Sequence, residues 1–383
     1  MSALVNGIGL VFAALSVKPL LDSLIPPPPA EKMTNIKVLV GSSGQSGGAE
    51  PSIHLFDFVG KTVGFHQSNG NKIDLGTGHD IQIEHKGSGS AQTEYISVIQ
   101  GGNDGLCISA ITVTTPDGVS YAYYGDAGWM CGAHWYYGNT TVSASGDGGI
   151  YQPRCIWVDG DGTSGITTKA YGIHLPSFIA NDLRVGYYND HNDAMCNAKP
   201  RFNKYDDLSI QDSIPYFNKQ MFDLSTLMDY SKDDTLNSQY YSTEPTEWNL
   251  FIGGFFKDKR EVAEAERLQK MRRDAAPAIA DKPKRANQGS KFKGKLVVSQ
   301  QSAHSAKELC ESKTSVGPDF VSTAEGVFCD MSEHKTWPLC TKAAQNNCFD
   351  QVKKQLKATK RNAPRDENGQ ILPNKEYDNV EHW

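Results

Sequence analysis

Short β-branched and aromatic runs alternate with turn residues through residues 36–175 of the chain. Residues 52–58, 94–100 and 107–115 are three of these runs, and Gly, Pro, Asn and Asp gather between them. This pattern is typical of antiparallel sandwiches and barrels. In the Pro-Asp-Gly turn at residues 116–118, the glycine tolerates the positive φ that a hairpin requires. The sequence therefore predicts a mainly β fold built on an antiparallel β-sandwich.

Composition divides the 383 residues into four parts. Residues 1–31 are a hydrophobic N-terminal segment, and residues 32–196 form the predicted β-sandwich. Residues 197–295 combine an acidic aromatic segment, a helix and a basic linker, with helical or irregular structure expected. Residues 296–383 form a small cysteine-bearing C-terminal region, and modules of this size usually need cross-links.

The N-terminal segment allows two interpretations. Residues 4–17 are nearly all apolar, but the stretch is shorter and more interrupted than the roughly 20 residues of a membrane span. A signal peptide would explain the hydrophobicity, although a basic start and a clear cleavage site are missing. A retained hydrophobic helix would need a partner or a bilayer surface. Both interpretations stay open.

The cysteines lie in two groups of four, one on each side of the linker. They are Cys107, Cys131, Cys155, Cys196, Cys310, Cys329, Cys340 and Cys348. Even groups predict disulfides within each group, and such bonds form in oxidising compartments. The connectivity is open from sequence alone, because several pairings are compatible with the spacing. The favoured pairs are Cys107–Cys131, Cys155–Cys196, Cys310–Cys329 and Cys340–Cys348.

A sequon predicts N-glycosylation at Asn139, which fits the same oxidising route. Together with the cysteines, it predicts an extracellular or cell-surface location. The formal net charge of −6 gives no support for attraction of the whole protein to nucleic acid. Residues 257–295 are rich in Lys and Arg, but they are expected to be a solvated linker, so nucleic acid is not an expected partner.

Two motifs that match catalytic or nucleotide-binding patterns fail in context. Residues 44–48 match G-x-S-x-G, but a nucleophile elbow needs a helix next, and Pro51 leads into another strand. Residues 160–165 match G-x-G-x-x-G, but β-branched residues follow where a dinucleotide site needs a helix. No nucleophile, base and orienting group form a convincing set. We therefore expect no catalytic residues and a non-enzymatic protein.

An aromatic segment carries the strongest indication of ligand binding. Trp129, Trp135, Tyr136 and Tyr137 gather around Cys131. Such rings often pack in a core, but aromatic residues on a hairpin can also face outward and bind a sugar or lipid. We predict these four aromatic residues to be ligand-binding, with core packing as the alternative.

A Gly-rich loop offers carboxylates for a metal ion. Asp159 and Asp161 flank a glycine, and Asp104 and Asp126 occupy comparable Gly-rich turns. Calcium takes roughly six to eight oxygen ligands, so several carboxylates would have to converge at one end of the sandwich. These four aspartates are the predicted metal ligands, and calcium is the cofactor that they suggest. An ordinary surface turn is the alternative.

The order of these segments resembles a known β-sandwich family. A strand at residues 36–40 ends in a Gly-rich turn, a hydrophobic strand follows at residues 53–56, and an Asn-Asp-Gly turn at residues 103–105 precedes a long strand. This order is similar to the PLAT (LH2-type) family over residues 36–130. The resemblance implies a sandwich fold. The family's usual Trp at the start of the long strand, which has an apolar docking role, is replaced by Leu106.

The whole chain also resembles uncharacterised proteins of filamentous fungi, through residues 155–161, 317–322, 329–331 and 377–383. That likeness implies no activity. We interpret the chain as a secreted or surface-associated, non-enzymatic binding protein. Its sandwich would engage lipid, carbohydrate or another protein, and it would associate with membrane surfaces. The alternative is a membrane-inserting, toxin-like or effector protein that uses its hydrophobic N-terminus.

Overall fold

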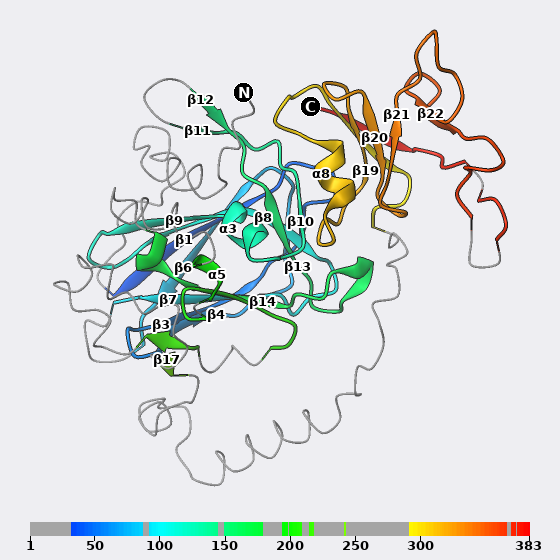
Figure 1. Ribbon diagram of the computed structural model, residues 1–383. Helices are drawn as coiled ribbons and strands as arrows, with labels where there is room; N and C mark the ends of the chain where they lie inside the picture. Colours follow the sequence, from blue (N-terminus) through cyan, green and yellow to red (C-terminus); the bar gives the residue numbers. More distant parts are fainter. Residues whose placement is uncertain are drawn as a thin grey trace.

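The computed structural model describes residues 32–86, 92–144, 149–178, 194–197, 199–208, 214–217, 241–242, 291–365, 369–372 and 374–383. They form a β-sandwich and a smaller C-terminal module that lies against one end of it (Figure 1). The hydrophobic N-terminal segment and the predicted helix at residues 257–276 lie outside the described residues. No helix in the described part of the chain is long and apolar enough to cross a membrane.

The first sheet of the sandwich has six strands. They are β1 (Met33–Val40), β6 (Gly78–Glu84), β8 (Leu106–Thr114), β9 (Ser120–Tyr124), β10 (Trp135–Tyr136) and β13 (Cys155–Val158). The order is β10-β13-β8-β1-β6, with β9 also on β8, and every pairing is antiparallel. The whole of β8 is buried, whereas the edge strand β6 buries only Ile81 and Ile83. One face of β6 meets solvent, as alternation in an antiparallel sheet predicts.

The second sheet has five antiparallel strands. They are β3 (Ser52–Phe56), β4 (Thr62–His66), β7 (Tyr95–Ile99), β14 (Ala170–His174) and β15 (Phe202–Tyr205), in the order β15-β14-β7-β3-β4. Ile36, Ile53 and Ile96 are completely buried in the core between the two sheets. The predicted antiparallel β-sandwich is confirmed. It continues past residue 196, because β15 pairs with β14.

Short elements complete the sandwich. The small strand pairs are β2 (Gly48–Ala49) with β5 (Lys72–Ile73), β11 (Val142–Ala144) with β12 (Gly149–Tyr151), and β16 (Tyr216–Phe217) with β17 (Tyr241–Ser242). The helices are α3 (Gly125–Met130) and α5 (Ala194–Asn197), and the 3-10 turns are η1 (Thr163–Gly165) and η2 (Leu175–Phe178). The predicted hairpin joins β8 to β9, and Gly118 there has a φ of 81°.

The C-terminal module is a five-stranded sheet with one short helix. Its elements are β18 (Lys295–Ser299), α8 (Ala306–Glu311), β19 (Asp319–Ser322), β20 (Val327–Asp330), β21 (Lys335–Pro338) and β24 (Asn379–His382), with a separate hairpin of β22 (Cys348–Asp350) and β23 (Gln355–Lys357). The order is β21-β20-β19-β18-β24. β18 and β19 are parallel because the chain crosses between them through α8. The hydroxyl of Ser305 caps α8 by accepting the Glu308 amide at 3.0 Å.

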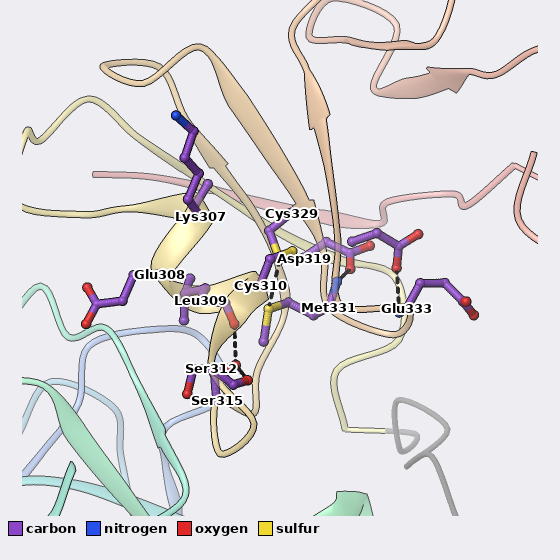
Figure 2. The surroundings of a disulfide bond; sticks show 12 residues. Lys307, Glu308, Leu309, Cys310, Ser312, Ser315, Asp319, Cys329, Met331 and Glu333 are labelled. Atoms are coloured by element: carbon purple, nitrogen blue, oxygen red, sulfur yellow. Dashed lines mark hydrogen bonds between the residues drawn. A yellow bond between two sulfur atoms is a disulfide. The ribbon is translucent and has the colours of Figure 1, made fainter. Parts of the chain in front are cut away.

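Disulfides fasten the C-terminal module as predicted. Cys310 bonds to Cys329 and Cys340 bonds to Cys348, so both favoured pairs are confirmed. Figure 2 shows the first of these bonds joining α8 to β20, with Met331 beside the sulfur atoms. The small sheet therefore has covalent links both to its helix and at the base of the β22–β23 hairpin.

The favoured pairs in the sandwich are wrong, although pairing within the group is confirmed. Cys107 bonds to Cys155, and Cys131 bonds to Cys196. The reason is strand order: β8 pairs with β13, which brings the Cα atoms of Cys107 and Cys155 to 5.3 Å. Short spacing along the chain does not predict these disulfide partners, because the sheet brings together residues that are far apart in sequence.

Two buried aspartates of the C-terminal module bind Lys375, which precedes β24. Its Nζ lies 2.8 Å from Oδ2 of Asp319 and 2.6 Å from Oδ1 of Asp330. The hydroxyl of Tyr377 donates to the same Asp319 oxygen at 2.7 Å. Burial raises the pKa of Asp319, and Lys375 opposes that shift. These contacts attach the last segment of the chain to β19 and β20.

Replacing Lys375 by Met should leave the two aspartates buried without their cation. We expect the free energy of unfolding at neutral pH to fall by about 3–5 kcal/mol, the usual cost of removing one partner of a buried pair. Without Lys375 the pKa of folded Asp319 rises further above its unfolded value. Protonation of Asp319 then favours the folded state, so the deficit should shrink as the pH falls.

Urea unfolding of both proteins at neutral and acidic pH measures this difference. Lys307→Met, which changes an exposed lysine on α8, should alter the free energy of unfolding by no more than about 0.5 kcal/mol. A deficit of Lys375→Met that stays constant across the pH range would contradict this account of the Asp319 pair.

Candidate functional site

The predicted ligand-binding aromatic residues lie under the C-terminal module. Trp135 and Tyr136 are fully buried, and 3% of Tyr137 is exposed. Trp129, near the end of α3, is partly buried against the same core. The prediction that these rings face outward is wrong for the three buried residues, because the C-terminal module covers this end of the sandwich. We call this contact the aromatic interface.

Rings from the C-terminal module close over the two tyrosines of the aromatic interface. Tyr137 packs on His304 and Phe320, with centroid distances of 4.7 and 5.8 Å. Tyr136 packs edge-to-face on Phe320 and Trp383, at 6.1 and 6.4 Å. Burial lowers the pKa of His304 to about 4, so its imidazole is neutral at neutral pH. The last residue of the chain is thus part of the interface.

Hydrogen bonds join the same two surfaces. The Nε1 of Trp157 donates to the carbonyl of Val316 at 2.8 Å, and the hydroxyl of Tyr136 donates to the carbonyl of Pro318 at 2.9 Å. The amide of Val316 donates to the carbonyl of Trp135 at 2.9 Å. Polar atoms of the large rings therefore have partners although the rings are buried, as buried Trp and Tyr require.

Arg154, which is partly buried, lies at the centre of the aromatic interface. Its Nη1 lies 3.0 Å from Oδ1 of Asp126 in the sandwich, and its Nη2 lies 2.8 Å from Oε1 of Glu308 on α8. Its guanidinium lies 4.0 Å from the ring centre of Trp129. The hydroxyl of Tyr137 also donates to Glu308, which points from α8 toward the sandwich (Figure 2). Burial raises the pKa of Asp126, and Arg154 opposes that shift.

The four predicted calcium ligands do not form one site. Asp126 belongs to the aromatic interface through Arg154. Asp104 pairs with Lys291 at 2.8 Å and with Lys72 at 3.0 Å. In the described part of the chain, no group of three or more His, Cys, Asp or Glu side chains is placed to hold a metal ion. The predicted convergence of carboxylates is therefore wrong.

Asp159 and Asp161 lie together in the turn that follows β13. Burial, and next the neighbouring Asp161, raise the pKa of Asp159 to about 6. Oδ1 of Asp161 accepts the amide of Thr163 at 2.9 Å, as in an ordinary tight turn. Calcium binding by these residues stays a prediction.

Asn139, the predicted glycosylation site, lies beside the aromatic interface. It is partly buried, and its side-chain oxygen accepts from Gln152 at 3.0 Å and from Gln301 at 2.8 Å. Gln301 comes from the C-terminal module, so this oxygen connects the two modules. Glycosylation of Asn139 stays a prediction.

A basic hairpin projects from the C-terminal module on the side away from the sandwich (Figure 1). We call residues 350–365 and 369–372 the arm. Among the described residues, seven large hydrophobic side chains are exposed, and three of them lie in the arm. Val352 is 91% exposed, Ile371 46% and Leu372 38%. Val352 lies in the β22–β23 turn, and Ile371 and Leu372 lie beside Arg365. Exposed apolar side chains of this size are found at interaction surfaces.

The arm is also strongly basic. Residues 351–365 contain six Lys or Arg and no Asp or Glu, in a chain whose net charge is −6. Lys357 pairs with Asp350 at 2.7 Å. No ion pair joins Lys353, Lys360 or Arg361 to another residue in the described ranges. Most of the arm's positive charge is therefore available to a partner.

Sequence reasoning missed the residues that turned out to define both surfaces. Arg154 and Glu308 are 154 residues apart, and neither stands out in a local pattern. The basic run of the arm was visible in the sequence, and its excess of Lys and Arg over acidic residues was the available signal.

Comparisons with known proteins give little guidance. No protein-family model matches the chain, and no curated protein matches it. Among solved structures it is similar to the crystal structure of Delta413-417:GS LOX, with 14% identity and a TM-score of 0.21 over 24% of this chain and 14% of that one. The complex of that LOX with arachidonate gives 9% identity and a TM-score of 0.21 over 43% and 20%. The chain thus spans at most a fifth of these structures, and TM-scores this low carry no functional argument.

Gly317 provides a test of the aromatic interface. A Cβ atom there would lie 2.2 Å from Cδ2 of Tyr136, whose ring is fully buried. The ring has no room to move without separating the modules. We therefore expect Gly317→Ala to lower the free energy of unfolding by about 1–3 kcal/mol, the usual cost of overpacking.

Gly101→Ala is the matched control, because no atom lies within 4 Å of a Cβ at that position. Its free energy of unfolding should change by no more than about 0.5 kcal/mol. Urea unfolding measures both variants. Similar stabilities for the two variants would show that Gly317 does not meet Tyr136 in this way.

Proposed function

We propose that the protein is an extracellular, non-enzymatic binding protein that attaches to anionic lipid membranes through the arm. The observation that carries the proposal is the exposed Val352 at the tip of a hairpin, directly followed by Lys353 and Lys354. The four disulfides support an extracellular location, because such bonds persist in oxidising compartments.

The charges of the arm fit the surface of an anionic bilayer. Each Lys or Arg near such a surface contributes about 1 kcal/mol, within the short range that salt allows. Lys353, Lys360 and Arg361 are exposed and have no acidic partner in the described part of the chain. Their summed attraction is enough for measurable but reversible binding.

The exposed apolar residues of the arm would add insertion into the bilayer to the electrostatic attraction of its lysines and arginine. Val352 exposes nearly all of its side chain, and removing that surface from water is favourable. Arg365 pairs with Ile371 in an isolated β-bridge, so a second apolar group also lies beside a cation. Stable membrane attachment usually takes both apolar insertion and electrostatic attraction.

Other ligand classes fit the arm less well. Proteins that bind single-stranded nucleic acid stack bases on aromatic side chains, and the arm contains no Phe, Trp or Tyr. A sugar platform also needs exposed rings, and the predicted ones, Trp135, Tyr136 and Tyr137, lie in the aromatic interface. Lipid is therefore the class that the arm supports best.

Charge reversal in the arm tests this function. The full chain should float with phosphatidylcholine vesicles that contain phosphatidylserine. Lys353→Glu with Lys354→Glu should bind them at least about tenfold more weakly, because two attractions of about 1 kcal/mol are removed and then reversed. Val352→Ser should weaken binding without changing its dependence on salt.

Lys307→Glu with Lys313→Glu is the matched control, since both lysines are exposed on the same module but outside the arm. This control changes the net charge equally and should bind nearly as wild type. Equal losses in the two double variants would mean that net charge, not the arm, drives binding. Binding to nucleic acid in place of vesicles would replace the lipid proposal.

A further inference from the structure

The arm contains a pair of basic residues, Lys360 and Arg361, in an exposed turn after β23. Both side chains are exposed, and no hydrogen bond or ion pair joins either side chain to another residue in the described ranges. The backbone of the turn is held by the carbonyl of Thr359, which accepts the amides of Asn362 and Ala363 at 2.9 and 2.8 Å. Exposed turns of polar residues with few hydrogen bonds are preferred sites of proteolytic cleavage.

A second basic pair of the arm is held more firmly. Lys353 and Lys354 lie in the loop of the β22–β23 hairpin, where Oδ1 of Asp350 accepts the amide of Lys353 at 3.0 Å. Asp350 also pairs with Gln355 across the hairpin, and the Cys340–Cys348 disulfide fastens its base. A protease must draw its substrate out as an extended chain. Cleavage at this pair therefore requires opening of the hairpin, whereas the turn after β23 can open by itself.

No covalent link would hold the residues after Arg361 to the rest of the protein once the chain is cut there. Cys348 is the last cysteine, so none of the four disulfides reaches residues 362–383, which we call the tail segment. The tail segment runs back from the arm to the sheet, where β24 pairs with β18 (Figure 1). After such a cut, only non-covalent contacts would hold it.

These contacts belong to the core of the C-terminal module and to the aromatic interface. Lys375 pairs with the two buried aspartates described above, and the amide of Trp383 donates to the carbonyl of Val298 at 2.9 Å. The ring of Trp383 packs on Phe320 at 6.0 Å. Loss of the tail segment would uncover these rings and the edge of β18. An uncovered strand edge can pair with another chain.

We propose that the peptide bond between Arg361 and Asn362 is a processing site for an endoprotease specific for pairs of basic residues, and that cleavage makes the tail segment detachable. The C–N bond breaks and one water molecule is added: its oxygen completes a carboxylate on Arg361, and both of its protons go to the nitrogen of Asn362. Such a protease recognises the two cations through carboxylates in its own specificity pockets. The inference does not depend on lipid binding by the arm.

Limited digestion of the folded full chain with a purified endoprotease that cleaves after Lys-Arg tests the site. Mass spectrometry under reducing conditions should detect the tail segment as a separate fragment, and Lys360→Gln with Arg361→Gln should abolish it. Lys353→Gln with Lys354→Gln is the matched control and should leave the rate unchanged. Basic pairs at residues 259–285 lie outside the described residues, and cuts there leave the tail segment attached to residues 291–361, so the masses differ.

Trypsin, which cleaves after either cation, compares the two pairs of the arm. Relative to the rates in the reduced, unfolded chain, cleavage after Lys354 in the folded chain should be at least about tenfold slower than cleavage after Arg361. The reason is that cleavage follows the population of the locally opened chain. Equal protection of the two bonds would overturn the proposed site. So would the absence of the tail segment fragment at protease concentrations that cut the same bond completely in the unfolded chain.

Dilution tests whether the tail segment is detachable. In the cut protein the tail segment is a separate binding partner, so the urea midpoint should fall over about a hundredfold dilution, whereas that of the intact chain should not change. Lys375→Met, once cut, should lose the tail segment on gel filtration at a concentration at which the cut wild type retains it. A urea midpoint of the cut wild type that is independent of concentration would contradict detachment.

Discussion

The guanidinium of Arg154 needs partners from both modules. Its side chain is 19% exposed, and a charge in such a position is costly unless it is paired and hydrogen-bonded. The sandwich supplies Asp126, and α8 of the C-terminal module supplies Glu308. Either module alone would leave part of this network without a partner. Together with the buried rings around it, the network makes the aromatic interface a contact that specifies one arrangement of the two modules.

Because the aromatic interface buries three of the predicted ligand-binding residues, the candidate binding surface lies in another part of the molecule. Trp135, Tyr136 and Tyr137 are used to hold the C-terminal module, so they are not free to bind a ligand. The same docking brings Lys291 to the oxygens around Asp104 and leaves the arm on the opposite side of the module (Figure 1). The pairing of Lys291 with Asp104 and the outward position of the arm are therefore both consequences of how the modules pack.

Local sequence patterns correctly predicted those features of the fold that depend on interactions between residues close together in the chain. The alternation of apolar residues and the turn at Gly118 were enough for the sandwich, and short spacing was enough for Cys310–Cys329. Pairing of Cys107 with Cys155 depends on β8 lying beside β13, which no local pattern contains. The burial of Trp135 likewise depends on the C-terminal module, whose Ser312 lies 177 residues further along the chain. The sequence shows that aromatic residues gather here, but it does not distinguish binding of a separate ligand from packing against the C-terminal module of the same chain.

The central claim is that the two modules form one body through the aromatic interface. Among the described residues, two hydrogen bonds between backbone groups cross it: the amide of Trp135 donates to the carbonyl of Thr314 at 3.0 Å, and the amide of Val316 donates to the carbonyl of Trp135 at 2.9 Å. Hydrogen exchange of these two amides in the full chain is the most direct test. We predict that both amides exchange only through global unfolding of the protein, and therefore at the slowest rate in the chain. Exchange of either amide as fast as that of exposed loop residues would contradict the account.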